Sequence, residues 1–74
     1  MKQAHYLVRI GGVLRRQREL KQLSQEVFAE MLGMHRTYYS AIERGEKNLT
    51  IKTLRRIADK LDTRMSTILS TAEV

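Results

Sequence analysis

Two short amphipathic stretches separated by one glycine constrain the fold of this chain more than any other feature of its sequence. The first begins at Ser24, whose hydroxyl is a favourable helix cap. Gly33 ends it, because glycine readily adopts the left-handed conformation found at helix C-termini. A second helix is predicted over residues 36–44. The short connection forces the two helices to cross at a steep angle.

Five residues in this segment each meet a particular structural requirement. Counted from Gln25 as position 1, they stand at positions 1, 5, 9, 15 and 18 and are Gln25, Ala29, Gly33, Tyr39 and Ile42. Ala29 is small, as the crossing of the second helix requires, and Gly33 supplies a positive φ in the turn. Tyr39 and Ile42 place the second helix in the core. This spacing predicts a helix-turn-helix at about 24–44 whose second helix lies in the major groove of DNA.

The remainder of the chain shows three further helical patterns. Leu7, Ile10 and Leu14 form an apolar stripe that continues to about Leu20. Two glycines, Gly11-Gly12, interrupt it at about 1 kcal/mol each relative to alanine, which predicts close packing against another element. The later patterns are a helix capped by Thr50 with a stripe from Ile51 to Leu61, and a last helix from Arg64 or Met65 to about Ser70.

No segment alternates between apolar and polar residues, so strands are not expected. The prediction is an all-α fold: a compact five-helix domain spanning residues 1–74, with its core at about 6–70. The length of 74 residues allows one domain only, and so small a core favours self-association.

The charge balance indicates the class of partner. Fourteen Lys and Arg against eight Asp and Glu give a net charge of +6. A small basic domain typically binds nucleic acid, although an anionic membrane surface or a merely solvated positive surface are the alternatives. No apolar run reaches about 18 residues and Arg9 interrupts the first one, so a cytoplasmic protein without membrane association is expected.

Several function classes lack the residues that they need. The chain has no cysteine, which excludes thiol chemistry and Cys-ligated zinc. Its two histidines, His5 and His35, and its scattered carboxylates form no catalytic constellation. We therefore expect no enzyme activity, no metal, no cofactor and no small-molecule ligand.

Longer motifs resemble those of the lambda-repressor-like (XRE) DNA-binding domains. They are Leu14-Arg-Arg-Gln-Arg18, Leu23-Ser-Gln25, Phe28-Ala29, Leu32-Gly33 and Ser40-Ala-Ile-Glu-Arg-Gly45. The resemblance covers about residues 10–69 and implies the five-helix bundle of that family. Within it, residues 35–50 are most similar to the controller proteins of restriction–modification systems, which dimerise and regulate transcription.

Contacts with double-stranded DNA follow from the motif and the resemblance. The expected base contacts are Arg36, Thr37, Tyr38, Ser40 and Ala41. Arg36 is expected to bind a guanine, with a phosphate or solvent alone as the alternatives. The expected phosphate contacts are Ser24, Gln25, His35, Arg44, Lys47 and Asn48. For Lys47 a solvated side chain is the alternative. The resemblance further implies that Arg18 and Glu43 form a buried ion pair between the first helix and the recognition helix.

Several positions depart from the family's pattern. Gln22 and Asp62 stand where glycine is common, so each is expected to need a strained or left-handed backbone. Tyr39 replaces the usual Ile or Val, so the core must accommodate a ring and a hydroxyl.

Apolar side chains near the C-terminus exceed what a short last helix readily buries. We interpret them as a homodimer interface, with intramolecular core as the alternative, and they are Leu61, Met65, Ile68 and Leu69. The sequence thus predicts a dimeric regulator of transcription bound to a palindromic operator, either a controller protein or a small phage-type repressor. An antitoxin of a toxin–antitoxin pair and a protein-interaction adaptor that retains the fold are the alternatives.

Overall fold

The computed structural model describes residues 4–74 and contains five helices with no strand in that range. The helices are α1 (Ala4–Leu20), α2 (Gln25–Leu32), α3 (Arg36–Glu43), α4 (Ile51–Lys60) and α5 (Met65–Ala72). The predicted all-α, five-helix fold is therefore confirmed. The first three residues of the predicted domain lie outside the described residues.

Local capping explains where the helices begin and end. The Ser24 side chain accepts from the backbone N–H of Val27, and the Thr50 side chain accepts from that of Thr53. Gly33 ends α2 with a φ of 70°. Gln22 and Asp62 also have positive φ, of 60° and 59°, as their place in the family pattern predicted.

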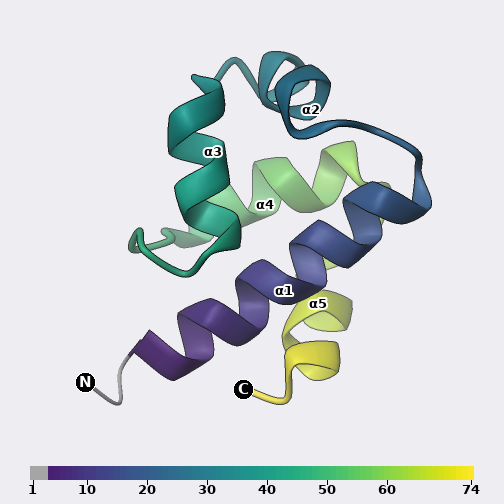
Figure 1. The fold of residues 1–74 in the computed structure, drawn as a ribbon. Coiled ribbons are helices and arrows are strands. Elements are labelled where there is room, and N and C mark those ends of the chain that lie inside the picture. Colours follow the sequence, from purple (N-terminus) through teal and green to yellow (C-terminus); the bar gives the residue numbers. More distant parts are fainter. Residues whose placement is uncertain (1–3) are drawn as a thin grey trace.

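The helices enclose one core. In Figure 1, α1 runs across the front of the molecule with α2 and α3 above it, α5 below and α4 behind. α1 packs against α3 and α5, while α2 packs against α3 and α4. The core side chains come from all five helices and from Leu61, the residue directly after α4. They are Ile10, Leu14, Phe28, Ala29, Leu32, Tyr39, Ile42, Leu54, Ile57, Ala58, Leu61, Ile68 and Ala72.

Gly11 allows α1 and α3 to approach closely. A Cβ atom at Gly11 would lie 2.3 Å from the carbonyl oxygen of Glu43, whereas one at Gly12 would meet nothing within 4 Å. The close packing predicted from the two glycines is thus required at the first of them only. The crossing brings α3 onto α1 at the point where α3 ends.

The structure also decides which side chains of each stripe face inward. Tyr39 is fully buried against Phe28, with ring centroids 5.3 Å apart in an edge-to-face arrangement, whereas Tyr38 is exposed. Ile51, expected at the start of the apolar stripe of its helix, is 67% exposed. Between Ala4 and Val74 no helix is both long and apolar enough to cross a membrane.

Candidate DNA interface

A buried ion pair between Arg18 of α1 and Glu43 of α3 holds α3 against the rest of the protein. Arg18 donates from Nε to Oε2 of Glu43 at 2.7 Å and from Nη2 to Oε1 at 3.1 Å. Its Nη1 donates to the carbonyl oxygen of Leu23 at 2.7 Å. The Gln25 amide nitrogen donates to Oε1 of the same carboxylate at 2.9 Å. These bonds join α1, the start of α2 and the end of α3 in one network.

The network keeps both partners charged. Burial alone would raise the pKa of Glu43, but the hydrogen bonds from Arg18 and Gln25 and the nearby Tyr39 hydroxyl outweigh it and hold that pKa below its usual range. The hydrogen bond to Glu43 raises the pKa of Arg18. Burial raises the pKa of Tyr39, and the Glu43 carboxylate that its hydroxyl faces acts in the same direction. That hydroxyl reaches hydrogen-bond geometry with none of the described groups.

The start of α3 projects from the molecule. Arg36, Thr37 and Tyr38 occupy its first turn and are all exposed. His35 caps the helix, since its Nδ1 accepts from the backbone N–H of Thr37 at 3.1 Å, and its other ring nitrogen remains available to a ligand. The first turn thus presents a guanidinium and two hydroxyls at the protein surface.

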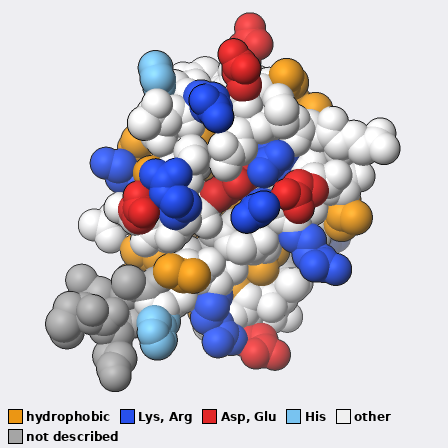
Figure 2. Space-filling model, in the orientation of Figure 1, with side chains coloured by type: hydrophobic (Ala, Val, Ile, Leu, Met, Phe, Trp, Pro, Cys, Tyr) orange, Lys and Arg blue, Asp and Glu red, His pale blue; other side chains and the backbone are white. Residues whose placement is uncertain are grey.

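The segment after α3 adds cationic side chains that are already engaged within the protein. Arg44 donates to the Ser40 hydroxyl at 2.6 Å and to the Glu46 carboxylate at 3.0 Å. The Lys47 ammonium lies 5.7 Å from the centre of the Tyr38 ring, a cation–π distance. In Figure 2, Lys and Arg side chains lie across the middle of this face, and acidic side chains lie beside several of them.

Most of the predicted contact residues are accessible. Ser24, His35, Arg44, Lys47 and Asn48 are exposed, while Gln25 and Ser40 are partly buried. Ala41 does not fit the predicted role of a base contact. It is buried at 6% exposure and therefore offers little surface to a base.

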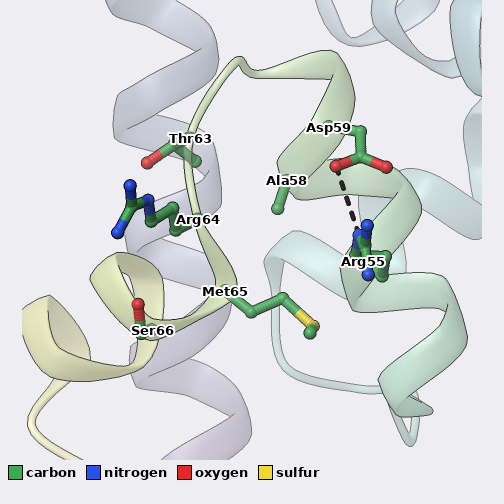
Figure 3. A pocket seen from close by; sticks show the side chains of 7 residues that line it. All are labelled: Arg55, Ala58, Asp59, Thr63, Arg64, Met65 and Ser66. Atoms are coloured by element: carbon green, nitrogen blue, oxygen red, sulfur yellow. Dashed lines mark hydrogen bonds and ion pairs between the residues drawn. The ribbon is translucent and has the colours of Figure 1, made fainter.

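The predicted dimer interface is wrong for two of its four residues. Leu61 and Ile68 are 2% and 1% exposed inside the protomer, because the turn between α4 and α5 folds both into the core. Met65 and Leu69 remain partly exposed and pack against that core. Met65 lines a shallow groove between α4 and α5, and in Figure 3 its side chain extends from the start of α5 toward α4.

Several arginine contacts were not predicted from the sequence. Arg56 donates to the carbonyl oxygen of Leu32 at the end of α2. Arg9 donates to the carbonyl oxygen of Ala72 at 2.7 Å and to the Glu73 carboxylate at 3.0 Å. No local signal marks these pairs, because their partners lie 24 to 64 residues apart in the chain.

Comparisons with known proteins agree with this geometry. A family model described as helix-turn-helix matches residues 14–68. Control protein C.SmaI of Serratia marcescens is 42% identical over 57 residues, which are 77% of this chain and 68% of that protein. Control protein C.MunI of a Mycoplasma species is 39% identical over 67 residues, which are 89% and 90% of the two chains. The crystal structure of the restriction-modification controller protein C.AhdI from Aeromonas hydrophila has a TM-score of 0.79 at 35% identity, covering 84% of this chain and 94% of that one.

The five-helix fold and the exposed start of α3 define a helix-turn-helix domain of the XRE type, and the chain belongs to this family. The resemblance to restriction–modification controller proteins, predicted from residues 35–50, is likewise confirmed.

Proposed function

We propose that this chain is a sequence-specific, dimeric DNA-binding regulator of transcription, either a restriction–modification controller protein or a small phage-type repressor. One observation carries the proposal: Arg36, Thr37 and Tyr38 are exposed together at the start of a helix that a buried ion pair holds in place. The net charge of +6 and the names of the relatives support it. Under the same proposal, the protein acts in the cytoplasm and is not an enzyme.

The contacts divide into two kinds under this proposal. Arg36 reads a guanine through two hydrogen bonds, and Thr37, Tyr38 and Ser40 contact neighbouring base edges. The phosphate contacts set the register of the protein on the duplex and are made by Ser24, Gln25, His35, Arg44, Lys47 and Asn48.

Dimerisation is proposed through the outer side of α5. Met65 and Leu69 retain apolar surface there, next to the groove between α4 and α5. Two recognition helices related by a two-fold axis read half-sites about 34 Å apart, one turn of DNA, which makes the operator palindromic. Sedimentation at micromolar concentration tests this part: persistent monomers in the absence of DNA would contradict it.

The main test is selection of bound sites from random duplex DNA, followed by affinity measurements across a salt series. We expect a palindromic consensus, whose binding Arg36→Ala weakens by about 10- to 100-fold while the fold survives. Arg15→Ala is the matched control, since Arg15 is an exposed arginine paired with Glu19 on α1. If no sequence is enriched and binding is weak and salt-sensitive, the antitoxin or adaptor function replaces this one.

A further inference from the structure

We infer that Glu43 positions the Gln25 side chain for its contact with a DNA phosphate, an inference that rests on the proposed function. Gln25 is the first residue of α2 and Glu43 is the last residue of α3. Their side chains meet through the hydrogen bond from the Gln25 amide nitrogen to Oε1 of Glu43, at 2.9 Å. This bond joins the start of the supporting helix to the end of the recognition helix.

The carboxylate determines which way the amide of Gln25 faces. An amide presents a carbonyl oxygen on one side and an NH₂ group on the other, and an ionised carboxylate only accepts hydrogen bonds. Glu43 therefore selects the orientation with the nitrogen directed inward. One N–H of Gln25 is used by Glu43, and the second N–H of the same nitrogen stays available as a donor.

Glu43 is itself held rigidly, which makes it an effective support. Its side chain is 3% exposed and accepts two hydrogen bonds from Arg18, whose side chain is 8% exposed. Arg18 also binds the carbonyl oxygen of Leu23, directly before the cap of α2. The start of α2 is thus fixed through the backbone at Leu23 and through the side chain at Gln25.

Around Gln25 the surface presents further donors to an anion. The Ser24 hydroxyl accepts from the backbone N–H of Val27 and retains its own proton for donation. The first backbone N–H groups of α2 have no partner within the helix. A phosphate oxygen placed here meets a neutral, pre-oriented amide donor, and Gln25 adds directionality without adding charge.

The test is a double-mutant cycle on the operator selected with the wild-type protein, using Gln25→Ala, Glu43→Gln and the double variant. Gln25→Ala is expected to weaken binding by about tenfold with no change in the slope of affinity against salt, because Gln25 is neutral. Glu43→Gln, measured where circular dichroism shows full folding, is expected to weaken binding by a similar factor. The double variant is expected to bind within about twofold of Gln25→Ala, because Glu43 affects binding through the orientation of Gln25.

Controls separate the possible results. Gln17→Ala, a glutamine on α1 outside the network, is expected to bind as the wild type does. If Glu43→Gln fails to fold, Glu43→Asp takes its place, since it retains the charge and withdraws the carboxylate from Gln25. Unchanged affinity of Gln25→Ala would overturn the inference, and so would fully additive losses, which mean that Glu43 affects binding independently of Gln25. A wild-type protein that selects no DNA sequence would instead overturn the proposed function.

Discussion

The guanidinium of Arg18 and the carboxylate of Glu43 join α1 to the last residue of α3 through hydrogen bonds of 2.7 and 3.1 Å. Their side chains are 8% and 3% exposed, so the pair lies inside the protein. Removing one partner of a buried pair typically costs about 3–5 kcal/mol, because the other charge is left without compensation. The pair therefore makes the packing of α3 on α1 dependent on charge.

Acid is expected to destabilise the fold through Glu43. Its pKa in the folded protein lies below the ordinary value of 4.5, so its charge stabilises the fold above that pH. As the pH falls below about 4.5, the unfolded chain binds the proton first, and the stabilisation is lost down through the lowered folded pKa. Urea unfolding at pH values from 7 to 3 measures the effect.

Two variants identify Glu43 as the source. Glu43→Gln is expected to be less stable at pH 7 and to depend less on pH below 4.5 than the wild type. Glu19→Gln, in an exposed pair with Arg15, is expected to retain the wild-type acid profile. Equal acid sensitivity in all three proteins would contradict the assignment.

Glu46 is expected to compete with DNA for Arg44. The two side chains are bonded at 3.0 Å and both are exposed, and the pairing raises the pKa of Arg44 and lowers that of Glu46. Glu46→Gln frees the guanidinium, so we expect binding about two- to fivefold tighter at low salt, with the gain shrinking as salt rises. Glu19→Gln removes the same charge from α1 and is the control. Equal gains from both variants would show a general charge effect.

Alanine substitutions at the two neighbouring glycines of α1 are expected to change the stability of the protein in opposite directions. At Gly11 the added Cβ would collide with backbone atoms of Glu43 and Ile42, all within 2.7 Å, and the loss is expected to reach about 2 kcal/mol or more. At Gly12 the space is open, so alanine is expected to stabilise the helix by about 0.5–1 kcal/mol. Thermal unfolding of the two variants measures both, and a similar response from them would refute the close α1–α3 crossing.

The hydroxyl of Tyr39 is expected to add nothing to stability. It is buried and reaches hydrogen-bond geometry with no described group, whereas its ring packs edge-to-face on Phe28. Tyr39→Phe keeps the ring and removes an unsatisfied polar atom, so its stability is expected to equal or exceed that of the wild type, by up to about 1 kcal/mol. A fall in melting temperature of several degrees would instead show that the hydroxyl bonds to Glu43 in solution.

The helices and their order were predictable because their signals are local. Ser24 and Thr50 cap helices through bonds to residues three positions away, and Gly33 ends α2 through its own backbone conformation. The exposed start of α3 at Arg36 was predictable for the same reason. The positive φ of Gln22 and Asp62 was predicted from the resemblance instead, because glycine is common at both positions in the family.

Only the tertiary structure decided which side chains are buried between helices and which residues of different helices are in contact. Leu61 and Ile68 were predicted to lie at a dimer interface, although both are buried in the core of the protomer. The bonds from Gln25 to Glu43 and from Arg56 to Leu32 span 18 and 24 residues. Caps and stripes act within one or two turns of a helix, whereas these contacts depend on the angles at which separate helices cross, and those angles are set by the packing of the whole core.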